Sequence, residues 1–296
     1  MNIKGCCMGF TENINRVVIA GVGMIGGSVG LSLKRVGFKG KIIGLGRRWS
    51  SLKRAIDAGA VDSVSMDFDE ALKDADLLVI GTPVNTITEI VKEAIKYTPK
   101  GCIITDVGST KKLVNEIEKL MPDGVYFVGA HPMAGSHKTG VDSADAHLFE
   151  KSTCIITPTE STNSEAKDTV SEMWRMIGAH VYIMSPEEHD FLVAAASHLP
   201  HTVACALVNV VTDAENDQGR GIDFSATGFA DMTRIASGSP EIWKGILIQN
   251  ADMVVSMLDR MESELATFRN ILETKNEEML VEKLNQAKKI RDSIRR

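Results

Sequence analysis

The most chemically informative residues are a glycine series near the amino end of the chain. A short apolar run, residues 17–20, is followed by glycines in the spacing G-x-G-x-x-G. In such a turn the first glycine permits a sharp bend, the second leaves room for a pyrophosphate, and the third lets a helix pack closely on a strand. Because the amide groups of a helix amino terminus attract anions, the pattern predicts a dinucleotide-binding turn. Its residues are Gly21, Gly23, Met24, Ile25 and Gly26.

The residues about twenty positions further on indicate which dinucleotide binds. In related units an acidic residue at the end of the second strand accepts a hydrogen bond from the ribose 2′-hydroxyl of NAD. Here that position is Gly46, and it is followed by Arg47 and Arg48, with Ser51 close behind. A guanidinium pairs with phosphate oxygens in a bidentate way, so the sequence predicts NADP, with NAD as the alternative. The competing interpretation is that both arginines are solvated surface charges.

Polar residues follow three further apolar runs, where predicted strands end. They are Thr82 and Pro83, Ser109 within Asp106-Val-Gly-Ser, and His131, which begins a His-Pro-Met-Ala-Gly-Ser-His stretch that ends at His137. Ligands of parallel sheets bind beyond the carboxyl ends of the strands. An imidazole has an ordinary pKa near neutrality, which suits a general base. We therefore predict that His131 is catalytic; a purely structural histidine is the alternative.

Two histidines and an arginine stand out in the second half of the chain. His198 and His201 are three residues apart, which places both imidazoles on one face of a helix. With no third ligand nearby, no metal site is predicted. Arg234 lies between apolar neighbours, and we expect a partly buried guanidinium that pairs with Asp231 or with a substrate carboxylate.

The elements that position the first group of residues alternate between short apolar strands and helices. This alternation is typical of a parallel sheet covered on both faces, so an α/β Rossmann-type doubly wound domain is expected over residues 16–185. Residues 1–15 are expected to form a loose amino-terminal leader. The expected strands are 17–20, 41–45, 77–81, 102–106, 126–130, 153–158 and 180–184, and the expected helices are 25–35, 51–58, 86–97, 111–120 and 164–177.

Strand patterns largely vanish after residue 185, and an all-α domain that binds substrate and dimerises is expected over residues 186–296. A helix over 188–212 is apolar almost all round, which indicates that it lies inside something larger than this half of the chain. We infer that it forms the core of a homodimer. A loop is expected over 216–228, and helices over 240–270 and 277–294.

Bulk properties exclude several classes of protein. A length of 296 residues suits about two domains. The net charge of −6 argues against a nucleic-acid partner, and the basic residues from 283 onward are interpreted as a solvated helix end. No apolar run near the ~20 residues that cross a bilayer and no signal peptide are recognised, so no membrane association is expected. Five cysteines without metal-ligand spacing indicate a reducing cytoplasm.

Together these motifs resemble the prephenate/arogenate dehydrogenases of tyrosine biosynthesis, over about residues 16–296. The motifs that carry the resemblance are Gly21-x-Gly-x-x-Gly26, Asp106-x-Gly-Ser109, His131-Pro-Met-Ala-Gly-Ser-His137, His198-Leu-Pro-His201 and Asp231-Met-Thr-Arg-Ile-Ala236. The resemblance implies an oxidoreductase that converts prephenate to 4-hydroxyphenylpyruvate, with loss of carbon dioxide and hydride transfer to NADP. Arogenate dehydrogenase, which forms tyrosine directly, is the alternative. The loop after His131 has no acidic residue before Asp142 to hold the ammonium of arogenate, which favours prephenate.

The resemblance also implies a role for each site residue. His131 would take the proton of the ring hydroxyl while hydride leaves the same carbon, and Ser109 would orient both groups. Arg234 would hold the ring carboxylate. The remaining contacts would be His137, His198 and His201 to the substrate, and Thr82 and Pro83 to the cofactor.

Two other classes of protein remain as alternatives. A β-hydroxyacid dehydrogenase or imine reductase would carry a catalytic lysine on the first helix after the sheet, and residues 188–209 contain none. A non-enzymatic NADP sensor would not need Ser109, His131 and Arg234 together.

Overall fold

The computed structural model describes residues 8–135, 138–218 and 227–294. The chain groups into two compact units, Met1–Asn250 and Ala251–Arg296, and each is described by itself.

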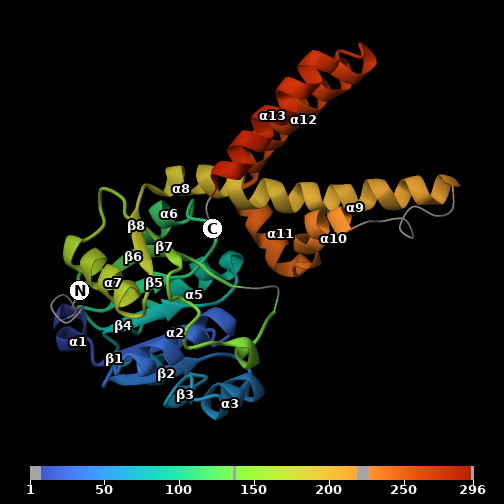
Figure 1. Cartoon of the computed structure of the whole chain (residues 1–296). Coiled ribbons are helices and arrows are strands. Elements are labelled where there is room, and N and C mark those ends of the chain that lie inside the picture. Colours follow the sequence, from blue (N-terminus) through green and yellow to red (C-terminus); the bar gives the residue numbers. More distant parts are fainter. Residues whose placement is uncertain (1–7, 136–137, 219–226, 295–296) are drawn as a thin grey trace. The chain divides into compact units, whose positions relative to one another are not determined.

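An eight-stranded sheet forms the centre of the first unit, in the order β3-β2-β1-β4-β5-β6-β7-β8 (Figure 1). All pairings are parallel except that between β6 and β7. The strands are β1 (Arg16–Ala20), β2 (Lys41–Leu45), β3 (Ser63–Ser65), β4 (Leu77–Ile80), β5 (Ile103–Asp106), β6 (Tyr126–Met133), β7 (Thr153–Thr157) and β8 (His180–Ile183). The predicted doubly wound parallel sheet is therefore confirmed, and the antiparallel pairing of β7 with β6 is a feature that was not predicted. The edge strand β3 was not predicted, because its three residues include two serines and show no apolar run.

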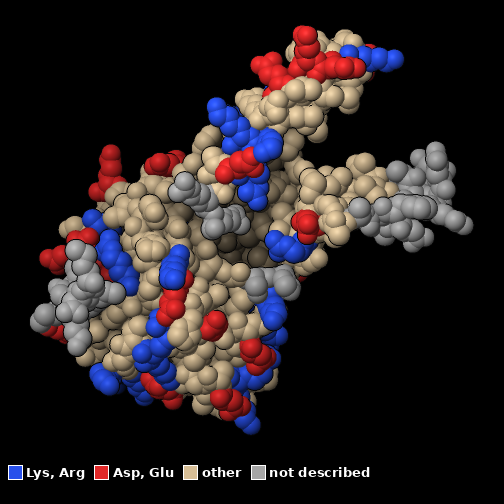
Figure 2. Space-filling view, in the orientation of Figure 1, with Lys and Arg blue, Asp and Glu red and all other residues tan. Residues whose placement is uncertain are grey.

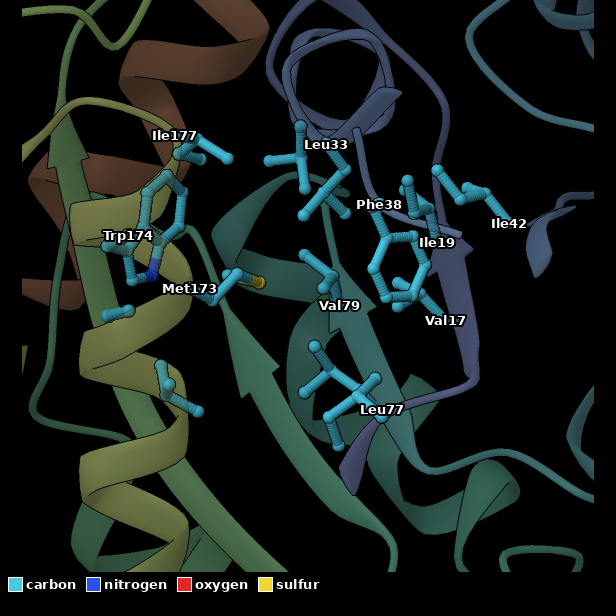
Figure 3. Close-up of a cluster of buried hydrophobic side chains, with 14 of the residues drawn as sticks. Val17, Ile19, Leu33, Phe38, Ile42, Leu77, Val79, Met173, Trp174 and Ile177 are labelled. Atoms are coloured by element: carbon cyan, nitrogen blue, oxygen red, sulfur yellow. The ribbon is translucent and has the colours of Figure 1, made fainter. Parts of the chain in front are cut away.

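Helices cover both faces of this sheet, as expected for a doubly wound fold. Alternate residues of each central strand point to opposite sides. Val17 and Ile19 of β1 join one buried cluster with α2 (Met24–Arg35) and α7 (Ser164–Met176), shown in Figure 3. Val18 and Ala20 join a second cluster on the other face, with residues of three shorter helices. These helices are α4 (Phe68–Leu72), α5 (Ile87–Ala94) and α6 (Val114–Glu118). Helix α3 (Trp49–Asp57) packs near β2 and β3.

The residues before β1 are partly structured. Met8–Asn13 forms helix α1, and Phe10 is fully buried with its ring centroid 5.8 Å from that of Phe38. Burial of Phe10 and Ile14 attaches this segment to the core. The prediction of a loose leader is therefore wrong for the residues of it that the structure describes.

A long helical stretch follows the sheet. It comprises α8 (Pro186–Val193), a π-helical turn (Ala194–His198) and α9 (Leu199–Gln218). By length and composition alone Pro186–Asp213 could cross a membrane, a test that the core helix of a globular protein also passes. This corrects the expectation that no segment is long and apolar enough. The predicted loop 216–228 is wrong at both ends, because α9 continues to Gln218 and α10 (Thr227–Thr233) begins at Thr227; residues 219–226 lie outside the described part.

Two helices, α11 and α12, occupy the region where a single helix over 240–270 was expected. A short 3₁₀ turn (Arg234–Ser237) and α11 (Pro240–Gln249) complete the first unit, and the predicted helix 240–270 is broken at Asn250. The second unit pairs α12 (Ala251–Glu273) with α13 (Glu277–Ser293), and Lys283 Nζ lies 2.9 Å from a Glu264 carboxylate oxygen. On the face drawn in Figure 2, basic and acidic side chains are interspersed, in keeping with the net charge of −6.

Candidate active site

The glycine turn between β1 and α2 has the steric properties that its spacing predicts. Gly21 has a φ of +89°, and a Cβ at this position would lie 2.5 Å from Thr82 Cγ2. A Cβ at Gly26 would lie 2.3 Å from the carbonyl oxygen of Gly21, whereas one at Gly23 would meet nothing within 4 Å. Gly23 is the N-cap residue of α2, and no side chain there accepts a hydrogen bond from the helix amides. The turn therefore leaves open space in front of an uncapped helix amino terminus, a suitable place for a pyrophosphate.

A cavity of about 860 Å³ adjoins this turn. Most of the predicted cofactor residues line it: Gly21, Gly23, Arg47, Arg48, Ser51, Thr82 and Pro83. Met24 and Ile25 do not line this cavity. They lie instead against the loop after β6, since a Cβ at Gly135 would be 3.3 Å from Met24 Cε and 3.6 Å from Ile25 Cδ1. The glycine turn and the segment that follows His131 are therefore neighbours.

His131 lies near the end of β6, in the part of the strand that extends past β5 and pairs with β7. Its Nδ1 is 2.8 Å from Nε2 of His189, and Nδ1 of His189 is 2.7 Å from Oδ1 of Asp190. An ionised carboxylate only accepts hydrogen bonds, so His189 donates from Nδ1 and accepts at Nε2. His131 must then donate from Nδ1, so Nε2 of its neutral ring carries the unprotonated lone pair. This chain of contacts prepares His131 to accept a proton.

Asp190 is itself held by the segment that follows β5. The backbone amides of Lys111 and Lys112 donate to its two carboxylate oxygens at 2.7 and 2.8 Å. Helix α8, which carries His189 and Asp190, is thereby fastened to the carboxyl edge of the sheet.

A fully buried ion pair lies beneath this arrangement. Lys111 Nζ is 2.5 Å from Oδ2 of Asp106, and both side chains are 0% exposed. Asp106 also accepts from the amides of Gly108 at 2.8 Å and Ala130 at 3.2 Å. The pair thus joins the turn that carries Ser109 to the residue before His131. Ser109 is half-buried in that turn, but its hydroxyl makes no hydrogen bond to His131 among the described residues.

His198 and His201 lie against α11 and the residue that follows it. Nδ1 of His198 is 3.2 Å from Nδ2 of Asn250, which also donates to the Asp190 carbonyl at 2.8 Å. The ring of His201 stacks on Trp243 with centroids 3.5 Å apart and planes 7° apart. Within the described residues no group of three or more potential metal ligands occurs.

Arg234 occupies the 3₁₀ turn before α11. Its side chain is exposed in the single chain and forms no ion pair with Asp231 among the described residues, so the expected partly buried pair is wrong. The same short segment packs on α9, and a Cβ at Gly238 would touch both Trp243 and His201. The end of the segment that carries Arg234 therefore lies beside the His201–Trp243 stack. His137, the remaining predicted contact, lies outside the described residues.

Burial controls the electrostatics of the four histidines. It lowers the pKa of His131 well below 6.5, and the nearby His189 and Lys111 lower it further. Burial also lowers the pKa of His189, against the opposing effect of Asp190. It lowers the pKa of His198 to about 4 and reduces that of His201. All four imidazoles are therefore neutral at pH 7, and His131 is in the form that accepts a proton.

These shifts predict that the fold loses stability below pH 6.5. The unfolded chain binds protons on these histidines at a higher pH than the folded chain does. The free energy of unfolding is therefore highest above pH 6.5, and it falls as the pH drops towards the pKa values of the folded chain. For His198 alone the change from 6.5 to about 4 corresponds to about 3 kcal/mol. Urea unfolding at pH 7 and pH 5 measures the loss, and the matched variant His198→Gln should show a smaller one. Equal free energies of unfolding at the two pH values would contradict the assignment.

Several residues of this site were not predicted from the sequence. His189, Asp190, Lys111, Asn250 and Trp243 all touch predicted site residues or each other. The adjacent pair His189-Asp190, placed at the start of the first helix after the sheet, was the available signal. Its contact with His131 spans 58 residues, which no local spacing reveals.

Comparisons with known proteins find relatives with similar domains and a similar fold. Residues 29–183 match a family model described as the nucleotide-binding domain of prephenate dehydrogenase, and residues 185–286 match its dimerization domain. The prephenate dehydrogenase of Bacillus subtilis is 37% identical over 94% of this chain and 76% of its own length. The crystal structure of prephenate dehydrogenase from Aquifex aeolicus with hydroxyphenyl propionate and NAD⁺ superposes with a TM-score of 0.91, at 35% identity over 95% of this chain and 99% of that one. The arogenate dehydrogenase of Synechocystis gives a TM-score of 0.81, at 27% identity over 94% and 99%.

Proposed function

The chain belongs to the prephenate dehydrogenase family, and on this premise we propose that it converts prephenate to 4-hydroxyphenylpyruvate with hydride transfer to NADP. It is an oxidoreductase with a pyridine-nucleotide cofactor. The observation that carries the proposal is the contact chain from Asp190 through His189 to His131, which leaves Nε2 of His131 unprotonated. The loop that follows His131 contacts the start of α2.

The free Nε2 of His131 is the general base of the proposed reaction. It removes the proton of the ring hydroxyl, and the resulting imidazolium is stabilised through His189 by the Asp190 carboxylate. When bound, the nicotinamide accepts the hydride that leaves the same ring carbon. Loss of carbon dioxide from the oxidised ring yields an aromatic product, which makes the reaction irreversible. The protein therefore has to supply mainly positioning and one base.

The remaining predicted residues would position the substrate. We assign the ring carboxylate to Arg234, which is exposed in the short turn before α11. His198 and His201 would face the side chain of the substrate. Ser109, in the turn held by Asp106, would orient the ring hydroxyl.

The charges of the site favour prephenate over arogenate. The ammonium of arogenate would need a free carboxylate. Asp190 and Asp106 are occupied by His189, Lys111 and backbone amides, and Asp142 pairs with Arg54 at 2.8 Å. Absorbance at 340 nm with each substrate, using NAD and NADP in turn, tests the proposal. Higher kcat/KM for arogenate would reject the choice of prephenate, and no turnover of either substrate would reject the function.

The preference for NADP is expected to depend on Arg47 and Arg48. Both line the cavity near the glycine turn, and Gly46 leaves no carboxylate to repel a 2′-phosphate. Because a hydrogen bond to a charged group contributes about 1.5–3 kcal/mol, the variant R47A/R48A should raise the KM for NADP by about 10–100-fold and change that for NAD little. Lys53→Ala on α3, the helix that follows Arg48, is the control, because Lys53 lies outside the cavity lining. An equal rise in KM for both nucleotides would show that the arginines do not recognise the 2′-phosphate.

The helical half is proposed to form a homodimer over residues 186–296, with the domain boundary at 185/186. The match of residues 185–286 to a dimerization domain supports this, as do apolar side chains that the single chain leaves exposed. Examples are Val210 at 65% and Ile248 at 73% exposed. The cytoplasmic location stays a prediction from the sequence.

A further inference from the structure

The long helical stretch after the sheet contains one turn that is wider than an α-helix. The amide of Leu199 donates to the carbonyl of Ala194, five residues back, whereas an α-helix would use the residue four back. The turn Ala194–His198 therefore holds one residue more than a regular helix would. It lies between the His189–Asp190 pair and His201, and His198 is its last residue.

Pro200 gives a physical reason for the wide turn. A proline has no amide hydrogen, and in a helix its ring collides with the carbonyl four residues earlier, here that of Ala196. A regular helix through this point would leave the Ala196 carbonyl without a donor and against the ring. The wider turn removes that conflict. Pro200 is exposed in the single chain, so its ring is not needed to fill the core.

The extra residue changes which side chains share a face of the helix. At 3.6 residues per turn each residue advances about 100°, so positions eight apart, such as Asp190 and His198, would differ by about 80° in a regular helix. One extra residue in the turn removes about 100°, which leaves them roughly 20° apart. The contacts agree, because the single amide nitrogen of Asn250 donates to the Asp190 carbonyl at 2.8 Å and lies 3.2 Å from His198 Nδ1.

We propose that Pro200 is a positioning residue for the reaction. By imposing the wide turn it aligns His198 with Asp190 and directs His198 and His201 towards the active site, on the side where His189 orients His131. The proposal rests on the proposed function, since it assigns the substrate contacts to His198 and His201. It concerns the geometry of the helix, so it can also be tested without turnover.

The test is the variant Pro200→Ala, which permits a regular helix through this turn. We expect the KM for prephenate to rise at least 10-fold while the Kd for NADP is unchanged. The Tm should stay equal or increase, because proline is the least favourable residue inside a helix. Pro240→Ala is the matched control, since Pro240 is exposed and stands at the first position of α11, where proline is tolerated.

A second variant separates alignment from other effects of Pro200. Deletion of Ala196 together with Pro200→Ala removes the extra residue, so a regular helix restores the alignment of His198 with Asp190. Recovery of the KM supports the proposal. An unchanged KM in Pro200→Ala, or a raised KM that the deletion does not restore in a folded protein, overturns it.

A measurement that does not depend on activity distinguishes the role of Pro200 from the proposed function. In the wild-type chain burial lowers the pKa of His198 to about 4. NMR titration should show this pKa rise towards 6.5 in Pro200→Ala, as the imidazole leaves its place beside Asn250. An unchanged titration overturns the positioning proposal. Absence of turnover in the wild-type chain would instead reject the proposed function and leave this result standing.

Discussion

Replacement of His131 by asparagine is expected to lower kcat by about 10²–10⁴-fold, the usual contribution of a general base. The asparagine amide can still donate towards His189, but it provides no basic nitrogen in place of Nε2. Because His131 does not line the cavity beside the glycine turn, the Kd for NADP should not change. Steady-state rates at 340 nm and a fluorescence titration with NADP measure the two quantities.

The control for this prediction is His180→Asn, an exposed histidine on the edge strand β8. It should leave kcat unaltered. A His131→Asn enzyme with kcat within threefold of the wild type would remove His131 from the mechanism and direct attention to another base.

Replacement of Lys111 by methionine is expected to destabilise the protein by about 3–5 kcal/mol. The substitution leaves the Asp106 carboxylate buried without its cation, at a position where both side chains are 0% exposed. It also removes the group that fixes Asp106 between the amides of Gly108 and Ala130. Equilibrium unfolding in urea, followed by tryptophan fluorescence, measures the loss.

Two further variants separate this effect from loss of a long side chain. The double variant K111M/D106N removes both charges and should recover much of the lost stability, since a buried ion pair contributes little against a neutral replacement. Lys92→Met breaks an exposed pair with Glu89 and should cost no more than about 1 kcal/mol. If Lys111→Met behaved like Lys92→Met, the buried pair would not organise the site.

The sequence alone predicts most of the sheet, because short apolar runs that alternate with helical patterns are typical of buried parallel strands. The reversal at β7 could not be predicted, since strand direction leaves no trace in the apolar run of residues 153–157. The short edge strand Ser63–Ser65 and helix α1 were missed because each depends on tertiary contacts more than on local pattern.

Some features of the candidate site could likewise be predicted from local sequence, and others depend on contacts between distant residues. The steric roles of Gly21 and Gly26 follow from spacing, because close backbone approach excludes a Cβ whatever surrounds it. The link from His131 to His189 does not follow, since it joins a strand end to a helix 58 residues later. The exposure of Arg234 was wrongly predicted, because apolar neighbours along the chain do not determine which side of a short turn faces solvent.

The reversed strands at the edge of the sheet have a mechanical consequence. Only Met184 and Ser185 separate β8 from α8, and both are held: the Met184 amide donates to Ile156, and the Ser185 hydroxyl accepts from the Glu188 amide. The connection from sheet to helix therefore has little slack. His189, four residues after Ser185, is therefore held to the sheet by the chain itself as well as by its contact with His131.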